Sequence, residues 1–171
     1  NSTNRLNIFI MKQPKVVTIG LGYIGLPTSA LIANNNISVY GVDINQKVVD
    51  TINAGKIHIV EPTLDEAVAK AVKEGFLKAG TKPVMADTYL IVVPTPFKAK
   101  NEPDISFVQA ATESILPLLK EGDLYIIEST SPIGTTEKML DYIYTVRPEL
   151  KDKLFIAYCP ERVLPGNVMF E

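Results

Sequence analysis

The fold of this chain is constrained most strongly by the hexapeptide GLGYIG at residues 20–25, which connects an apolar run to a segment with helical periodicity. A G-x-G-x-x-G pattern is a weak signal alone, but between a strand and a helix it predicts a dinucleotide-binding turn. We expect Gly20 to permit the tight turn, Gly22 to let the backbone approach a pyrophosphate, and Gly25 to allow close packing of helix and strand. The alternative is a tight turn with no ligand.

Residues around this turn extend the prediction to specific contacts. Backbone N–H groups at Tyr23 and Ile24, where the helix starts, are expected to receive phosphate oxygens. Asp43 ends the next expected strand, eighteen residues after Gly25. A carboxylate there can accept hydrogen bonds from a ribose diol and repels a 2′-phosphate, which favours NAD over NADP. Asp43 could also serve only as the N-cap of the following helix.

Short apolar runs alternate with helix-period segments along the rest of the chain. The expected strands are Val16–Gly20, Ser38–Asp43, Pro83–Ala86 (the weakest), Tyr89–Val93, Leu124–Ser129 and Leu154–Tyr158. Unbroken runs such as YLIVV are typical of parallel strands buried on both faces. The pattern predicts an α/β fold of the Rossmann type, a doubly wound and mainly parallel sheet with helices on both faces.

Helix boundaries have their own signals. Thr63 and Glu66 fit a capping box in front of a helix that Gly75 ends. Asp104 is expected to cap a later helix. Further helices are expected at Asn45–Asn53 and Thr135–Val146.

The remaining unusual stretches also follow expected strands. VPTPF holds Thr95 between two prolines, and ESTSPIGTTE (Glu128–Glu137) offers several hydroxyls that could serve a ligand or only cap a helix. YCPERVLPG (Tyr158–Gly166) places Glu161 beside Arg162. A fixed carboxylate can orient or deprotonate a water, and an arginine can pair with phosphate, although a surface ion pair is an equal alternative. Ligands bind at the carboxyl edge of such sheets, so these stretches predict one site there.

Two reactive residue types occur once each. A nucleophilic thiolate needs a base or a positive neighbour, and Arg162 could supply the charge for Cys159. Because a free cysteine is more often simply buried, we expect a structural role for Cys159. His58, in IHIVEP, is expected to be structural as well. No cluster of His, Cys, Asp and Glu has metal-ligand spacing, so we expect no metal.

Composition excludes several classes of function. The 171 residues are 46% apolar with a formal net charge of −2 and contain no basic block, which argues against nucleic acid as a partner. No apolar run is long enough for a membrane span. A single cysteine fits a reducing compartment and predicts a cytoplasmic location. We expect an N-terminal extension at residues 1–14, with Met11 a candidate native start, and one nucleotide-binding domain at residues 15–171.

Beyond these patterns, the sequence resembles the UDP-sugar 6-dehydrogenase family, and within it the branch acting on UDP-N-acetyl-D-mannosamine. The resemblance covers residues 15–171 and rests on the motifs IGLGYIGLPT, GVDIN, IHIVEP, VPTPFK, EPD, ESTSPIGTTE and AYCPERVLPG. Family members use NAD twice, taking a C6 alcohol to an aldehyde and then, through a cysteine-bound thiohemiacetal and thioester, to a uronate.

The resemblance also implies roles for individual residues. It places Tyr23, Ile24, Asp43, Thr95 and Thr136 at NAD. It places Arg162 and Val163 at the UDP-sugar substrate. It assigns Thr130 and Glu161 to positioning the catalytic water and supporting hydrolysis.

One departure from the family pattern is large. Members continue through a long central helix into a UDP-binding domain that carries the nucleophilic cysteine and a catalytic lysine, and they form homodimers or larger homo-oligomers. We therefore expect this chain to be the NAD-binding part and to be inactive by itself. UDP-GlcNAc or UDP-glucose oxidation, or a non-catalytic NAD-binding module, are the alternatives.

Overall fold

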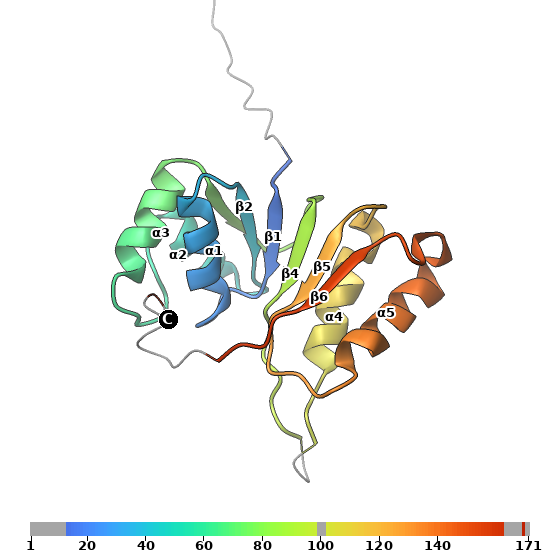
Figure 1. Ribbon diagram of the computed structural model, residues 1–171. Coiled ribbons are helices and arrows are strands. Elements are labelled where there is room, and N and C mark those ends of the chain that lie inside the picture. The colour runs from blue at the N-terminus through green and yellow to red at the C-terminus, as the bar shows by residue number, and fades with distance from the viewer. Residues whose placement is uncertain (1–12, 99–101, 163–168, 170–171) are drawn as a thin grey trace, which may run out of the picture.

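The computed structural model describes residues 13–98, 102–162 and 169. A six-stranded, wholly parallel sheet lies at its centre, with strand order β3-β2-β1-β4-β5-β6 (Figure 1). The strands are β1 (Val16–Ile19), β2 (Val39–Val42), β3 (Leu77–Gly80), β4 (Thr88–Ile91), β5 (Leu124–Ile127) and β6 (Phe155–Tyr158). Because β1 lies between β2 and β4, the order reverses at β1, as in doubly wound sheets.

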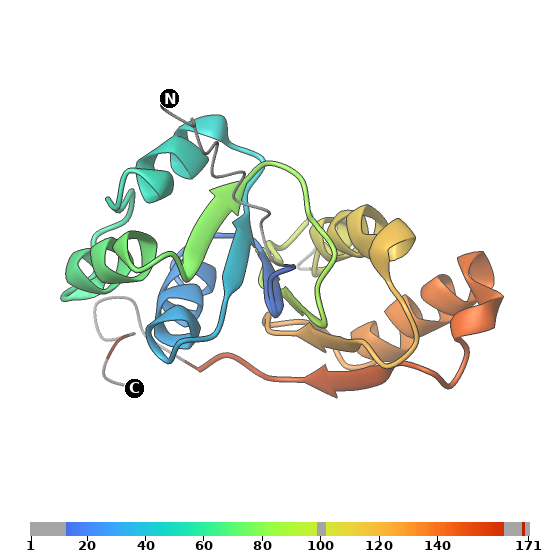
Figure 2. The same cartoon turned by 90° about the horizontal axis from the view of Figure 1, so that it is seen from above.

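Within the described residues, five α-helices surround the sheet. They are α1 (Gly25–Asn34), α2 (Gln46–Asn53), α3 (Leu64–Lys73), α4 (Ser106–Ile115) and α5 (Thr135–Val146), with 3₁₀ turns η2 (Leu116–Leu118) and η3 (Pro148–Leu150). Figures 1 and 2 show α1, α2 and α3 grouped with β2 and β3, and α4 and α5 grouped with β4 to β6. The predicted Rossmann-type fold is confirmed.

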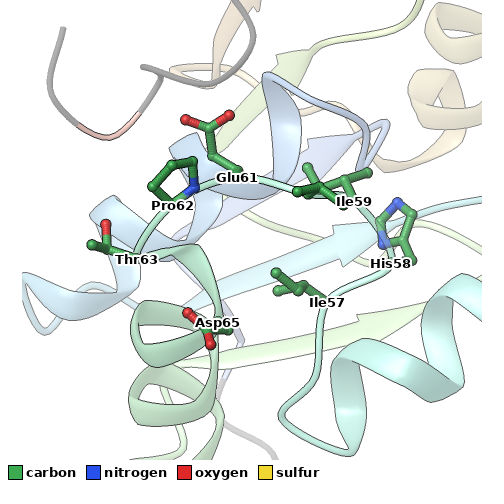
Figure 3. A pocket seen from close by; sticks show the side chains of 8 residues that line it. Ile57, His58, Ile59, Glu61, Pro62, Thr63 and Asp65 are labelled. Carbon is green, nitrogen blue, oxygen red and sulfur yellow. The ribbon is translucent and has the colours of Figure 1, made fainter.

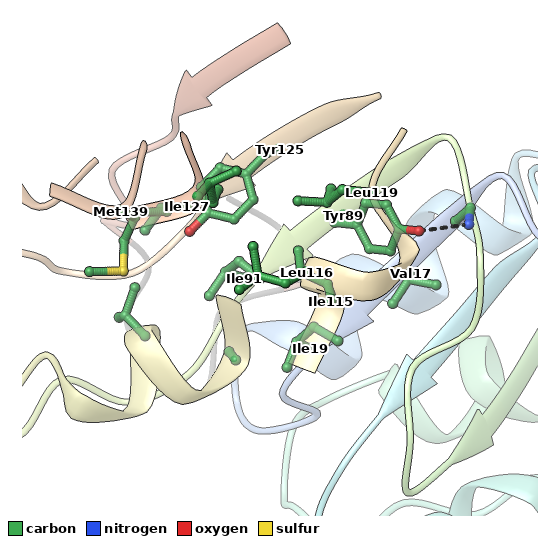
Figure 4. Close-up of a cluster of buried hydrophobic side chains, with 14 of the residues drawn as sticks. Val17, Ile19, Tyr89, Ile91, Ile115, Leu116, Leu119, Tyr125, Ile127 and Met139 are labelled. Carbon is green, nitrogen blue, oxygen red and sulfur yellow. Dashed lines mark hydrogen bonds between the residues drawn. The ribbon is translucent and has the colours of Figure 1, made fainter. Parts of the chain in front are cut away.

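The buried side chains form two clusters. One joins α1, α2 and α3 to β2 and β3, and its largest members include Leu26, Ile52 and Leu64. The other packs α4 and α5 against the central strands and contains two fully buried tyrosines, Tyr89 and Tyr125 (Figure 4). Each group of helices therefore has its own core, and the sheet lies between the two cores. Packing on both cores determines where the carboxyl ends of the strands lie.

Both buried tyrosines satisfy their hydroxyl groups, as burial requires. The Tyr89 hydroxyl accepts from the Ala86 N–H at 3.1 Å. The Tyr125 hydroxyl lies 2.7 Å from that of Thr112, and burial raises the pKa of Tyr125 to about 12.

One predicted strand is wrong. Residues 83–86 form no ladder, and the strand that pairs with β2 is Leu77–Gly80 instead. Pro83 has no N–H to donate, and Val84 and Ala86 pack on the core from a connection between β3 and β4. The true strand alternates buried Leu77 and Ala79 with exposed Lys78, but four residues ending in glycine give too short a pattern to stand out.

The capping predictions had mixed outcomes. The capping box is wrong, because Thr63 has φ 63° and its hydroxyl makes no capping hydrogen bond, whereas a capping box needs an extended residue. Gly75 does end α3, in the left-handed conformation. Asp104 acts from one position outside the cap residue: its Oδ1 accepts from the N–H of Ser106, the first residue of α4, at 2.9 Å.

Candidate functional site

The carboxyl ends of the strands lie side by side because the strands are in register. Ile19 of β1 pairs with Val42 of β2 and with Ile91 of β4. Ile91 pairs in turn with Ile127 of β5, and Ile127 with Tyr158 of β6. The loop that follows each strand therefore starts at the same level, which brings the predicted stretches to one edge.

The glycine-rich loop has the geometry that its sequence predicts. Gly20 has φ 103°, its N–H donates to the Val42 carbonyl at 2.8 Å, and a Cβ there would collide with the Val92 carbonyl oxygen. A Cβ at Gly25 would collide with the Gly20 carbonyl oxygen. The fold itself requires a glycine at both positions.

Gly22 behaves differently from its two neighbours in the motif. A Cβ built there meets no atom within 4 Å, and the residue is exposed. Nothing in the packing of the described chain requires a glycine here. The bare backbone therefore leaves a cradle that a bound group can approach closely.

The start of α1 points into the same region. Its cap residue, Ile24, makes no side-chain capping hydrogen bond, and the first turn carries no acidic residue. N–H groups at an uncapped helix start attract anions, because they have no intrahelical partner and lie at the positive end of the helix dipole.

Asp43 ties the glycine-rich loop to the end of β2. Its Oδ2 accepts from the Leu21 N–H at 3.4 Å and its Oδ1 from the Asn45 N–H at 2.9 Å. The N-cap of α2 is Asn45, whose side chain accepts from the Lys47 N–H, so Asp43 is not the cap itself. The carboxylate keeps further lone pairs for a diol.

A cleft of about 440 Å³ connects these groups with the ends of β4, β5 and β6. It is lined by residues from every predicted stretch: Gly20, Leu21, Gly22, Tyr23, Ile24, Asp43, Val92, Val93, Pro94, Thr95, Glu128, Ser129, Thr130 and Glu161. The structure thus brings Tyr23, Ile24, Asp43, Thr95, Thr130 and Glu161 into one cavity.

The far wall of the cleft is held by hydrogen bonds between loops. The Thr95 hydroxyl donates to the Thr130 carbonyl oxygen, so it can only accept from a ligand. The buried Ser129 hydroxyl donates to the Val93 carbonyl at 2.9 Å, and the Tyr158 hydroxyl donates to the Ser129 carbonyl at 3.2 Å. These bonds tie together the ends of β4, β5 and β6.

Glu128 is a cleft residue that sequence analysis did not single out. It is half-buried, the Thr28 hydroxyl of α1 donates to it, and Glu161 lies near enough to interact. Burial raises the pKa of Glu128, the Thr28 hydrogen bond lowers it, and the Glu161 charge raises it, with an upward net shift. Its position at the end of β5, where ligands bind, was the available signal.

A second hollow of about 530 Å³ adjoins the cleft at Gly20, Asp43, Val93 and Pro94. Its other lining is mostly apolar and includes Ile44, Pro83 and Phe107. Ile44 is 93% exposed. The hollow can accommodate a flat apolar ring next to a group that is bound by Asp43.

Some predicted site residues lie elsewhere. Thr136 lines a separate hollow between the start of α5 and β6, so the structure does not bring it into the cleft. Arg162 is exposed beside Glu161 and is not among the lining residues. Val163 lies outside the described residues. Cys159 is exposed, and its N–H donates to the Ile127 carbonyl at 2.9 Å.

His58 belongs to a different cavity. The loop at residues 57–63 and the start of α3 form an open hollow of about 590 Å³, in which His58 is exposed and Glu61 is buried (Figure 3). It shares no lining residue with the cleft, although it is the larger of the two. We assign the cleft as the site because backbone donors, a carboxylate and hydroxyls converge there, and volume alone does not indicate chemistry.

Two kinds of feature are absent from the described part of the chain. Three or more His, Cys, Asp or Glu side chains nowhere come together in a group that could hold a metal ion. None of the helices in that part combines the length and the apolar character needed to cross a membrane.

Comparisons with known proteins agree on the family to which this chain is similar. The family profile described as UDP-glucose/GDP-mannose dehydrogenase family, NAD binding domain, matches residues 14–171. The UDP-N-acetyl-D-mannosamine dehydrogenase of Escherichia coli (strain K12) is 56% identical over 169 residues, which is 94% of this chain and 40% of that protein. The NDP-N-acetyl-D-galactosaminuronic acid dehydrogenase of Ralstonia nicotianae is 51% identical over 164 residues, 91% of this chain and 39% of that protein.

A solved structure is similar over nearly the same part of this chain. The UDP-N-acetyl-mannosamine dehydrogenase Cap5O from Staphylococcus aureus superposes with a TM-score of 0.81 at 40% identity, covering 91% of this chain and 38% of that one. This chain therefore spans about 40% of the length of the relatives that it matches.

Proposed function

The chain belongs to the UDP-glucose/GDP-mannose dehydrogenase family as its NAD-binding domain, and on that premise we propose that it supplies the cofactor half of a UDP-sugar 6-dehydrogenase. The reaction is the NAD-dependent, four-electron oxidation of UDP-N-acetyl-D-mannosamine to UDP-N-acetyl-D-mannosaminuronate, for surface polysaccharide synthesis. NAD serves as the hydride acceptor in both steps.

The observation that carries the cofactor assignment is the open space at Gly22. Gly20 and Gly25 are required by the fold, but Gly22 is not, so its bare backbone is explained by a group that must come close. Beside it lies the uncapped start of α1, which suits a pyrophosphate. The residues fit NAD.

The arrangement suggests how the chain orients NAD. Asp43 would accept from the adenosine ribose, and the apolar hollow beside Ile44 and Phe107 would take the adenine. The N–H groups around Tyr23 and Ile24 would hold the pyrophosphate. The nicotinamide would then lie toward Thr95 and the ends of β4 to β6.

Roles at the reacting carbon are proposed for residues on the far wall. Thr130 and Glu161 would hold and activate the water that hydrolyses the acyl intermediate, since a half-buried carboxylate can orient a water and take its proton. Arg162 and Val163 would contact the substrate. Thr136, in the first turn of α5, is proposed as a cofactor contact that a shift of the loop at residues 131–134 would have to bring toward the cleft.

The choice of sugar rests on the relatives. The E. coli protein named for UDP-N-acetyl-D-mannosamine and the Ralstonia protein named for an N-acetyl-galactosaminuronic acid are almost equally similar to this chain. An NAD-binding domain therefore discriminates sugars weakly. UDP-GlcNAc and UDP-glucose are the alternatives to be tested.

The remaining parts of the proposal concern the whole protein. We place residues 15–171 in the NAD-binding domain and residues 1–14 in an extension. The nucleophilic cysteine and the catalytic lysine would lie outside this chain, in the roughly 60% of the relatives that it does not span. The whole protein would be a cytoplasmic homodimer or larger homo-oligomer.

The test uses the intact protein that contains this chain. Absorbance of NADH is followed with UDP-N-acetyl-D-mannosamine, UDP-GlcNAc and UDP-glucose, and NADH is counted per sugar consumed. Two NADH per UDP-N-acetyl-D-mannosamine, with little from the other sugars, is the expected result. Activity with another sugar only would correct the substrate, and NAD binding without any turnover would favour a non-catalytic module.

A further inference from the structure

One helix supplies a wall of the apolar hollow beside the cleft, and that wall ends in a polar group. Four residues of α4 line the hollow, and their spacing places them on one helical face: Phe107, Ala110, Ala111 and Ser114. The aromatic ring and the serine hydroxyl belong to opposite ends of this face, with two small side chains between them. The two alanines leave room for a flat ring to lie against the helix.

Ser114 lies at the end of this wall that is remote from the carboxyl edge of the sheet. α4 leaves that edge, where Asp43 follows β2, and runs back toward the amino end of β5 (Figure 1). Because a helix rises 1.5 Å per residue, Ser114 lies about 10 Å farther along the helix axis than Phe107. A group that extends from Asp43 along α4 into the hollow therefore points toward Ser114.

The hydrogen of the Ser114 hydroxyl already has an acceptor. It is donated to the Ala111 carbonyl oxygen at 2.6 Å, within the same helix. A hydroxyl group has one hydrogen and two lone pairs, so Ser114 can only accept from a ligand while this bond lasts. Thr81, another hydroxyl of the lining, can donate or accept and therefore does not discriminate.

Purine bases differ at the edge that would meet Ser114. With the ribose held at Asp43, the base extends from N9 into the hollow, and its six-membered ring enters deepest. Adenine has an amino group at C6, which donates, whereas hypoxanthine and guanine have an oxo group there, which accepts. These 6-oxopurines also have a hydrogen at N1, but the ring would have to shift to present it to the same hydroxyl.

We propose that Ser114 makes the site select adenine as the base of its dinucleotide, by accepting a hydrogen bond from the C6 amino group and offering none to a C6 oxo group. This inference rests on the proposed function, because it requires NAD to bind with its adenine in the hollow. A 6-oxopurine could be paired only if Ser114 gave up its bond to Ala111. Such a base therefore forfeits one hydrogen bond.

The rest of the hollow does not distinguish one purine from another. Ile44 and Phe107 offer apolar surface, which contacts the face of any flat base equally well. Apolar pockets discriminate weakly between molecules of the same shape, whereas a group that pairs with a substrate N–H rejects an analogue that lacks it. Asp43 would thus recognise the ribose, and Ser114 would recognise the base.

The experiment compares NAD⁺ with nicotinamide hypoxanthine dinucleotide, in which hypoxanthine replaces adenine, by calorimetric titration of this chain. The proteins are the wild type, Ser114→Ala and Thr145→Ala. Ser114 is exposed on its helix and alanine has the highest helix propensity, so we expect the variant to keep the fold. Thr145 is the matched control, because its hydroxyl also donates to a carbonyl of its own helix, that of Asp141 at 2.7 Å, but lines neither the cleft nor the hollow.

The ratio of the two dissociation constants, hypoxanthine dinucleotide over NAD⁺, is the quantity that reports base selection. We expect a ratio of about five for the wild type and for Thr145→Ala, as one hydrogen bond implies. In Ser114→Ala the ratio should fall to about one, chiefly because NAD⁺ binds more weakly.

The outcomes separate the two proposals. Absence of NAD⁺ binding to the wild type would overturn the proposed function and this inference with it. NAD⁺ binding without any preference over the hypoxanthine dinucleotide would overturn this inference alone. So would a preference that persists unchanged in Ser114→Ala.

Discussion

The two ends of the cleft are built by different means. At the β1–β2 end, the geometry comes from the backbone: a positive φ at Gly20, a close approach at Gly25 and the free start of α1. At the β4–β6 end, it comes from side chains, as Thr95, Ser129 and Tyr158 bond to carbonyl groups of neighbouring loops. Glycines, which have no side chain, shape the first end, whereas side-chain hydrogen bonds shape the second.

This difference explains what each end can do. A backbone cradle recognises what all dinucleotides share, a pyrophosphate, and tolerates little change. A wall of hydroxyls and carboxylates can be altered residue by residue and therefore carries the chemistry of one reaction. We therefore expect substitutions at the two ends of the cleft to differ in their effects on stability and on cofactor binding.

The largest expected effect is the loss of stability in Gly20→Ala. Alanine at φ 103° is strained, and its Cβ meets the Val92 carbonyl oxygen. We expect the free energy of unfolding to fall by about 2–4 kcal/mol. Urea denaturation measures this, and a variant as stable as the wild type would contradict the backbone account of this end.

Gly22→Ala should separate binding from stability. Because its Cβ meets no protein atom, the melting temperature should stay close to that of the wild type. The methyl group would crowd the pyrophosphate, and we expect NAD affinity to fall about tenfold or more, on the order of 1.4 kcal/mol. Unchanged affinity in a titration would remove the loop from the cofactor site.

Asp43→Asn tests the carboxylate that ties the glycine-rich loop to the end of β2. Asparagine keeps one acceptor oxygen for the Leu21 and Asn45 N–H groups and loses the charge that repels a 2′-phosphate. NAD affinity should fall about fivefold, which corresponds to roughly 1 kcal/mol, while NADP affinity should fall less or rise. Parallel titrations with both cofactors would show an unaltered ratio if Asp43 served the loop alone.

Glu128→Gln should change how stability depends on pH. The folded-state pKa of Glu128 is raised above 4.5, mainly by burial, so the folded chain favours the protonated form. That stabilisation is fully present below the unfolded pKa and is lost as pH rises through the raised folded pKa. The variant should therefore gain melting temperature relative to the wild type from pH 4 toward pH 8. A difference in melting temperature that does not vary with pH would show that the charge of Glu128 does not lower the stability of the fold.

The smallest expected effect belongs to Thr95→Val. It removes the hydroxyl that donates to the Thr130 carbonyl, a single bond between two loops. We expect a loss of about 1 kcal/mol in the free energy of unfolding. Thr95→Ser, which restores the hydroxyl, is the control, and equal stability of all three chains would mean that this bond does not hold the far wall.

Much of the backbone-built end could be predicted from sequence. Glycines at fixed spacing after a strand have one common explanation, and Gly20, which was expected to permit the tight turn, has a positive φ of 103°. The parallel sheet followed from unbroken apolar runs. The third strand was missed because LKAG is short and poor in β-branched residues, while the apolar stretch after Pro83 looked more like a strand.

The side-chain-built end was less predictable for a physical reason. Burial raises the pKa of Glu128, and Thr28 and Glu161, which interact with it, are far from it in sequence. No local sequence pattern indicates such an arrangement. The position of Thr136 depends on the path of the loop before α5, which its hydroxyl-rich sequence does not determine. The sequence therefore located the edge of the sheet correctly but not the distribution of side chains along it.

The most direct test of the account is a calorimetric titration of this 171-residue chain with NAD⁺ and NADP⁺ under identical conditions. The account predicts saturable binding of one NAD⁺ per chain, with NADP⁺ clearly weaker because of the Asp43 carboxylate. Absence of NAD⁺ binding, or equal binding of the two cofactors, would contradict the assignment of the cleft as an NAD site.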